Sequence, residues 1–356
     1  MQKLFIIILL VFLQIPVYAQ GTDVSFDSTY ESAVVTGTTQ GQGENILYVT
    51  ELPSGETINL DTYGEAVPIG SRVYLEHFTD QGYYNFVAVN RNKGILILLT
   101  VFIFCILALA GKKGVRSLIA LGASMGLLFW VLVPLLVNGF DPIVTTLVFG
   151  LGVLGFSIFI THGLNRQSLV SFIGSFSSIV IAAVLLYCVT RAASMTGFID
   201  DHIQYLSFAT DNTLNLVRII SASVLIGILG VLDDITITQV AVVRELSDND
   251  TLSKRNIFQK SLRVGRDHVA SLVNTLVFAY LGATLPMVMY VSLLEIPFWI
   301  LTSYEFIFVE IIRSLIGAIA LTLAVPVTTW LATYVFIKSI RTEGEAFSTA
   351  CSHNHH

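Results

Sequence analysis

Short stretches that alternate apolar and polar residues fill the N-terminal quarter of the chain, and long apolar stretches fill most of the rest. Between residues 21 and 92, Gly and Pro separate alternating runs such as residues 46–49 and 72–75. This pattern is typical of antiparallel strands joined by turns. It predicts a small β-barrel domain over residues 20–92, which binds a ligand, docks neighbouring subunits or caps the rest of the protein.

Seven apolar segments follow, at residues 95–110, 118–137, 143–161, 169–189, 214–243, 269–292 and 306–337. Most have the roughly twenty residues that a helix needs to cross a bilayer. The fifth and seventh are longer, so we expect them to tilt, protrude or break. Breaks are expected between Gly227 and Gly230 and at Pro326.

Composition excludes an ordinary soluble domain, because only 12% of the residues are charged and 54% are hydrophobic, whereas about a quarter of a soluble sequence is charged. Residues 1–19 combine a basic start, an apolar core and a terminal Ala19, which predicts a cleaved signal peptide, or a short anchor if it is uncleaved. The exported segment has no cysteine and so no disulfide framework.

Basic residues predict the orientation, because short cytoplasmic loops are enriched in Lys and Arg. They gather at residues 112–116, 254–266 and 338–341, whereas the alternate loops carry acidic residues. We therefore expect an α-helical polytopic membrane protein with about seven transmembrane helices over residues 93–340, an extracytoplasmic β-barrel, and a cytoplasmic tail at 341–356. The basic segment 254–266 also has the pattern of a short amphipathic helix on the inner leaflet.

An acidic pair, Asp233 and Asp234, lies within the fifth apolar segment. Carboxylates at membrane depth are costly and by default indicate function. On a helix, Asp234 and Thr238 share a face, which favours Asp234 as the more sensitive of the two. Asp233 and Thr236 share an adjacent face, and Thr238 and Gln239 extend the polar stripe. Ser271 and Asn274 of the next segment lie at a matching depth.

These oxygen-bearing side chains suit protons, Na⁺ or divalent cations, and no particular metal is indicated. The two stripes are expected to face each other. The alternative is hydrogen bonding that only holds helices together.

Two further groups of polar residues are candidates for functional sites. Glu310 and Arg313 have the spacing of an ion pair on one helix, either as a gate or as a structural pair. Arg266, Asp267 and His268 lie at the expected cytoplasmic mouth, where His268 could relay protons. An ordinary solvated loop end is the alternative for this second group.

Four runs of the apolar region mix charged, polar and small residues. They are GVLDDITITQ at residues 230–239, GRDHVASLVNTL at 265–276, AYLGATLP at 279–286 and EIIRSLIG at 310–317. Together they resemble the bacterial YibE/F-like family of multi-pass membrane proteins, and the likeness extends over residues 94–340. This resemblance implies a permease-like protein of the bacterial inner membrane, and it implies no substrate.

The sequence thus favours a transporter or channel-like permease for a small polar solute or ion, with Asp233 and Asp234 as proton or cation sites. The alternative is a non-transporting structural or sensory subunit whose barrel docks a partner. No phosphate-binding loop, hydrolase motif or paired-cysteine motif is present, so we expect no enzyme, catalytic residue or cofactor. The expected partners are the lipid bilayer, the solute and possible further copies of the chain, and not nucleic acid.

Overall fold

The computed structural model describes residues 28–40, 46–79, 82–210, 213–248 and 253–352. The predicted signal peptide lies outside these residues. The chain divides into two compact units, with the boundary between Gly114 and Val115.

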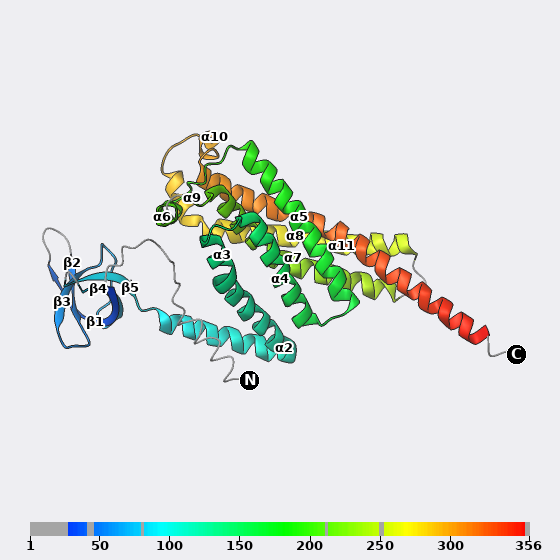
Figure 1. Cartoon of the computed structure of the whole chain (residues 1–356), viewed down its shortest axis with the longest axis horizontal. Coiled ribbons are helices and arrows are strands. Elements are labelled where there is room, and N and C mark those ends of the chain that lie inside the picture. Colours follow the sequence, from blue (N-terminus) through cyan, green and yellow to red (C-terminus); the bar gives the residue numbers. More distant parts are fainter. Residues whose placement is uncertain (1–27, 41–45, 80–81, 211–212, 249–252, 353–356) are drawn as a thin grey trace. The chain divides into compact units, whose positions relative to one another are not determined.

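The N-terminal unit contains a curled five-stranded antiparallel sheet (Figure 1), with strand order β3-β2-β1-β4-β5. Long β1 pairs with both β2 and β4, and its register with β2 shifts between Val35 and Gly37, as in a bulge that bends a strand. The edge strands approach each other, and the Tyr63 hydroxyl donates to Asn85 Oδ1 at 3.1 Å. The strands are β1 (Ser28–Gln40), β2 (Ile46–Glu51), β3 (Thr57–Asp61), β4 (Arg72–Phe78) and β5 (Tyr83–Val89).

The inner face of this sheet holds its own core, because alternate residues of each strand point to one side. The predicted strand-rich N-terminal unit is therefore confirmed as a curled sheet. The buried residues are Ala33, Val35, Tyr48, Leu52, Leu60, Val67, Val73 and Leu75.

A helical stretch of 46 residues, Asn92–Val137, occupies the region where two apolar segments were expected. It comprises α2 (Asn92–Leu127), the π-helical turn η1 (Leu128–Leu132) and α3 (Val133–Val137). Its backbone is non-helical at Gly111, with φ 51° and ψ −126°. Glycine adopts such angles without the clash of a Cβ atom, so the kink falls there.

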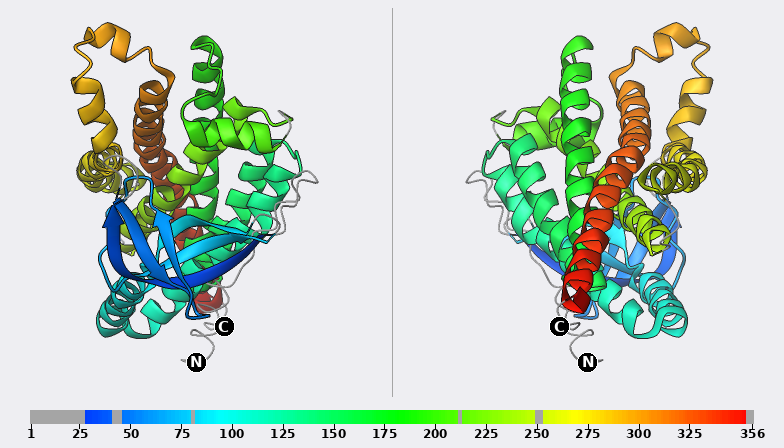
Figure 2. Two further views of the ribbon diagram at one scale, coloured as in Figure 1. Left: turned by 90° about the vertical axis from the view of Figure 1, so that its left-hand side faces the viewer. Right: turned by 90° about the vertical axis from the view of Figure 1, so that its right-hand side faces the viewer.

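The C-terminal unit is a bundle of helices, with α7 in contact with α4, α5, α8 and α11 (Figure 2). Leu225, Ile228 and Leu232 of α7 pack with Ile316 and Leu321 of α11. The helices are α4 (Pro142–His162), α5 (Arg166–Ala192), α6 (Asp201–Ala209), α7 (Leu216–Ser247), α8 (Lys254–Ala283), α9 (Leu285–Ser292), α10 (Phe298–Leu301) and α11 (Glu305–Ser352).

The predicted helix breaks at Gly227–Gly230 and at Pro326 are wrong. Both α7 and α11 run through these positions without interruption. The break lies instead at Thr284, where α8 and α9 form a bend of 66°. Pro286, at the start of α9, provides its reason, because proline cannot donate a backbone hydrogen bond to the preceding turn.

Two other expectations change with the observed helices. Residues 254–266 are not a separate amphipathic helix, because they are the first turns of the continuous helix α8. Within the described residues, five helical stretches are long and apolar enough to cross a membrane, or six if α8 and α9 count as one bent span. These stretches support a polytopic membrane protein.

Candidate functional site

The acidic pair of α7 splits between two environments. Asp233 is half-buried, and Ser157 of α4 donates to its Oδ2 at 2.9 Å. Asp234 is exposed and has no hydrogen bond or ion pair among the residues that the structure describes. Successive side chains of a helix diverge by about 100°. Asp233 therefore faces the neighbouring helix α4, and Asp234 points out of the bundle.

Thr236 and Gln239 join helices. Thr236 is fully buried, and its hydroxyl lies 2.7 Å from that of Ser175 on α5. Gln239 is also buried, and its Nε2 donates to the Ser261 carbonyl at 3.0 Å and to the Thr329 hydroxyl at 2.6 Å. These bonds tie α7 to α5, α8 and α11, which is the bundle-holding role of polar residues in membranes.

The polar stripe of α8 does not meet that of α7. Thr238 of α7 is half-buried, whereas Ser271 and Asn274 lie on an exposed face of α8. No described hydrogen bond links Ser271 or Asn274 to α7, so the two predicted stripes do not face each other.

The group at the expected cytoplasmic mouth lies on α8, within the helix and not in a loop. Arg266 and Asp267 are exposed, and His268 is half-buried. No ion pair is found for any of the three in the described part of the chain. Nor does that part contain a cluster of three or more His, Cys, Asp or Glu residues that could hold a metal ion.

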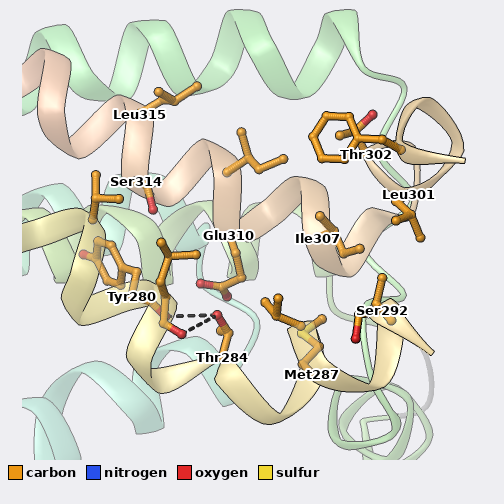
Figure 3. A pocket seen from close by; sticks show the side chains of 16 residues that line it. Tyr280, Thr284, Met287, Ser292, Leu301, Thr302, Ile307, Glu310, Ser314 and Leu315 are labelled. Atoms are coloured by element: carbon orange, nitrogen blue, oxygen red, sulfur yellow. Dashed lines mark hydrogen bonds between the residues drawn. The ribbon is translucent and has the colours of Figure 1, made fainter. Parts of the chain in front are cut away.

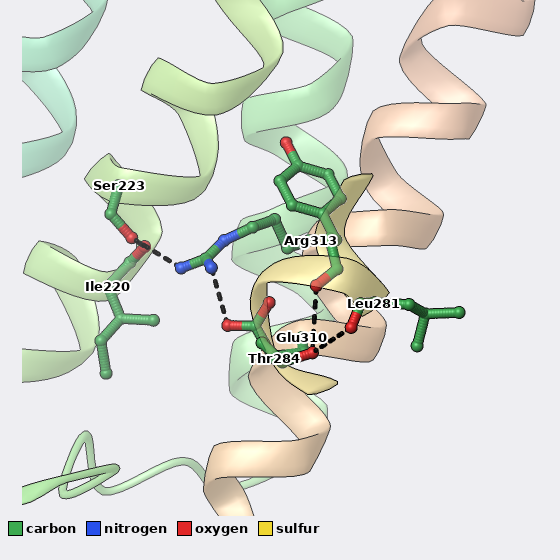
Figure 4. A network of polar contacts seen from close by, with 7 residues as sticks. Ile220, Ser223, Leu281, Thr284, Glu310 and Arg313 are labelled. Carbon is green, nitrogen blue, oxygen red and sulfur yellow. Dashed lines mark hydrogen bonds and ion pairs between the residues drawn. The ribbon is translucent and has the colours of Figure 1, made fainter. Parts of the chain in front are cut away.

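Glu310 and Arg313 form the ion pair that their spacing indicates (Figure 4). Arg313 Nη1 donates to Glu310 Oε1 at 2.7 Å, and Nη2 donates to Ser223 Oγ of α7 at 3.4 Å. The Arg313 guanidinium also lies 5.9 Å from the ring centroid of Tyr280 on α8, within the range of a cation–π contact. One arginine thus connects α7, α8 and α11.

A cavity of about 490 Å³ adjoins this ion pair, between α8, α9, α10 and α11 (Figure 3). Its walls are largely apolar, with polar groups from Glu310, Thr284 and Ser314. The second carboxylate oxygen of Glu310, Oε2, is buried without a hydrogen-bond partner in the described structure. An unpartnered buried acceptor typically costs about 1–3 kcal/mol, so this oxygen favours a proton, a cation or another donor.

Thr284 lies beside Glu310 at the break between α8 and α9 (Figures 3 and 4). Its hydroxyl donates to the Tyr280 carbonyl at 3.0 Å, within the last turn of α8. The ends of interrupted helices leave backbone carbonyls without intrahelical donors, and carbonyls of this kind coordinate cations in many transporters. The break, the cavity and the carboxylate therefore form the candidate site.

Sequence reasoning missed three elements of this region. The break had a signal in Leu285-Pro286, because a residue that precedes proline disfavours the helical conformation. Ser157 had none, since it lies 76 positions from Asp233 in the sequence. Glu305 was also missed, although it accepts hydrogen bonds from the Thr196 hydroxyl at 2.6 Å and the Gly197 amide at 2.5 Å, joining α11 to the loop after α5.

Comparison with known proteins places the chain in a family without adding a biochemical activity. Neither a curated protein nor a solved structure matches it. The model of the YibE/F-like protein family matches residues 98–338, which include the Asp pair, the broken helix and the Glu310–Arg313 ion pair. The chain therefore belongs to the YibE/F-like protein family.

Proposed function

We propose that the protein moves a small polar solute or ion across the bacterial inner membrane, through a helical domain of seven spans, with the barrel-like N-terminal unit outside. In this proposal the stretch Asn92–Val137 crosses twice, with its turn at the Gly111 kink, and α8 with α9 is one bent span. The observation that carries this proposal is the buried, unpartnered Oε2 of Glu310, a residue that lines the cavity at the broken helix. An ionisable residue within a membrane span is costly and usually serves transport or proton relay.

Asp233 provides a second carboxylate for the same activity. It lies near the middle of α7, and its contact with Ser157 leaves a half-buried acidic group within the bundle. In this proposal protons or cations bind at Glu310 and Asp233, whereas Thr236 and Gln239 hold the helices in place. The proposed activity assigns no enzymatic reaction to these residues.

The test uses the purified full chain in proteoliposomes that contain a pH-sensitive dye. An imposed membrane potential drives protons inward if the protein conducts or couples them. We expect wild-type vesicles to acidify and Glu310→Gln to abolish most of that signal. Glu295→Gln is the matched control, because Glu295 is exposed in the loop between α9 and α10.

A double variant separates charge from ion pairing. If Glu310 only neutralises Arg313, then Glu310→Gln with Arg313→Gln should restore flux, because no unpaired charge remains. If Glu310 is the proton or cation site, the double variant stays inactive. If wild-type vesicles acidify no faster than empty ones, the protein does not move protons.

The alternative is a structural or sensory subunit that transports nothing. The fully buried hydrogen bonds of Thr236 and Gln239 favour it, since they show polar residues used for packing. In that case the Glu310→Gln variant would change thermal stability, and neither it nor the wild type would show flux.

A further inference from the structure

A second cavity, of about 410 Å³, lies where the C-terminal end of α5 meets the first turns of α4 and α7. Its walls are polar, in contrast to the cavity at Glu310. No carboxylate lines it, and two arginines do. The polar lining residues are Thr190, Arg191, Ser194, Asn215, Arg218 and Ser221.

Arg218 is held in position by Asp141, with which it forms an ion pair. The other oxygen of Asp141, Oδ1, accepts the Ile143 and Val144 amides at 3.1 Å each, as the N-cap of α4. Asp141 is therefore fixed by the helix that it caps. Only one guanidinium nitrogen of Arg218, Nη1, is used in this pair, which leaves its other N–H groups as donors.

Arg191 has a different environment. Its guanidinium lies 5.6 Å from the ring centroid of Tyr187, one turn earlier on α5. No carboxylate pairs with it in the described structure. The cavity therefore has two cationic side chains and, with Asp141 included, one anionic neighbour, so a positive charge is left without compensation.

We infer that this cavity binds a phosphate group, carried either by a soluble anion or by a phospholipid headgroup. Guanidinium groups bind phosphate through paired charge-assisted hydrogen bonds. The two arginines, the Ser194 hydroxyl and the Asn215 amide come from α5, from the loop that follows it and from the start of α7. Donors from three segments suit a tetrahedral anion better than a planar carboxylate, which one guanidinium satisfies. The inference goes beyond the proposed transport activity and does not require it.

The experiment titrates inorganic phosphate into the purified full chain in a nonionic detergent by isothermal titration calorimetry, with acetate as the planar comparison. We expect phosphate to bind more tightly than acetate. Arg191→Gln should raise the phosphate Kd by roughly tenfold to a hundredfold, as expected for a lost hydrogen bond to a charged group. Arg191→Lys keeps the charge without the planar fork and should give an intermediate Kd.

Arg255→Gln is the matched control, because Arg255 is exposed at the start of α8 and lines neither cavity. Its Kd should equal that of the wild type. Size-exclusion profiles show whether each variant is folded. If Arg191→Gln does not fold, Arg191→Lys and the wild-type titration still decide the outcome.

Native mass spectrometry of the same preparations distinguishes the two sources. A phospholipid retained by the wild type and lost in Arg191→Gln, without binding of free phosphate, assigns the site to a lipid headgroup. Displacement of that lipid by free phosphate, or phosphate binding alone, assigns it to a soluble anion. Neither binding nor retention in the wild type, or equal binding in Arg191→Gln, would overturn the inference.

Discussion

At the scale of single residues, neighbouring aspartates of one helix have different surroundings. Asp233 accepts a hydrogen bond from Ser157, whereas Asp234 is exposed outside the bundle. The sequence favours Asp234, because it shares a helix face with Thr238. The contact with Ser157 reverses that order, since a coupling site must be enclosed by protein groups that respond when its charge changes.

We therefore predict that Asp233→Asn abolishes proton flux in proteoliposomes, or removes its pH dependence, whereas Asp234→Asn retains both. Asparagine keeps an oxygen that accepts from Ser157 but removes the charge, whose burial at the centre of a span costs about 2.5–3.5 kcal/mol. The Asp233→Asn variant should thus fold with an unchanged or higher unfolding temperature. Full, normally pH-dependent flux in that variant would contradict the assignment.

The polar residues of α7 show what the sequence can predict at this scale. The Asp pair and the Glu310–Arg313 pair were recognisable because charge in an apolar segment is conspicuous. The partners were not, because Ser157, Ser175 and Thr329 reach α7 from helices distant in the sequence. Ser and Thr are common in membrane helices, so their presence indicates no particular contact.

At the scale of helices, neither Gly227 nor Pro326 interrupts its helix. Gly227 stays within α7, where a Cβ atom would lie 2.9 Å from the Tyr280 hydroxyl. This glycine permits close helix packing, and it does not break the helix. Pro326 is also accommodated within α11. The bend at Thr284 is instead accompanied by Pro286, so the sequence identified apolar segments well and placed their interruptions poorly.

Close packing predicts the effect of enlarging Gly265 of α8. A Cβ atom there would lie 2.5 Å from Val325 Cγ1 and 2.6 Å from Gln239 Oε1, at the junction of α7, α8 and α11. We expect Gly265→Ala to destabilise the protein by about 1–3 kcal/mol, as overpacking usually does. The measurement is the unfolding temperature in detergent.

Gly282→Ala is the control on the same helix, because a Cβ atom at this position would meet no other atom within 4 Å. Alanine should be neutral or stabilise α8 by up to about 1 kcal/mol through helix propensity. Equal unfolding temperatures for the two variants would show that the three-helix junction can expand freely.

The kink of α2 gives a second comparison of this kind. Gly111 has φ 51°, which an L side chain rarely adopts, whereas a Cβ atom at Gly122 would meet no atom within 4 Å. We expect Gly111→Ala to cost about 1–3 kcal/mol of backbone strain. Gly122→Ala should be neutral or slightly stabilising. If Gly111→Ala unfolds at the wild-type temperature, the kink is not needed for stability.

At the scale of the whole molecule, composition and periodicity predicted a strand-rich N-terminal unit followed by long apolar helices. Alternating residues predicted the N-terminal sheet, and apolar segments predicted the membrane-type helices. The number of spans was less predictable, because α2 to α3 form one interrupted stretch and α8 with α9 form a bent pair. The length of an apolar run does not reveal how its helix bends.

The orientation of the chain remains a prediction from the distribution of Lys and Arg. We expect the N-terminal unit and residues 191–213 outside, and residues 254–266 inside, because basic loops stay in the cytoplasm. The test starts from a variant without Cys105, Cys188 and Cys351. In this background, one cysteine at a time replaces an exposed residue, at Glu56, Asp201 or Arg255. A membrane-impermeant maleimide added to intact bacterial spheroplasts should label the first two positions and not the third.

Permeabilised spheroplasts provide the control, because all three cysteines should then react. The same topology places the candidate phosphate cavity and the start of α11 toward the outside, since both lie near the loop that contains Thr196 and Gly197. Labelling of Arg255→Cys from outside, together with protection of Asp201→Cys, would show that the protein has the opposite orientation in the membrane. A solute would then first meet the Arg191 and Arg218 cavity from the cytoplasm.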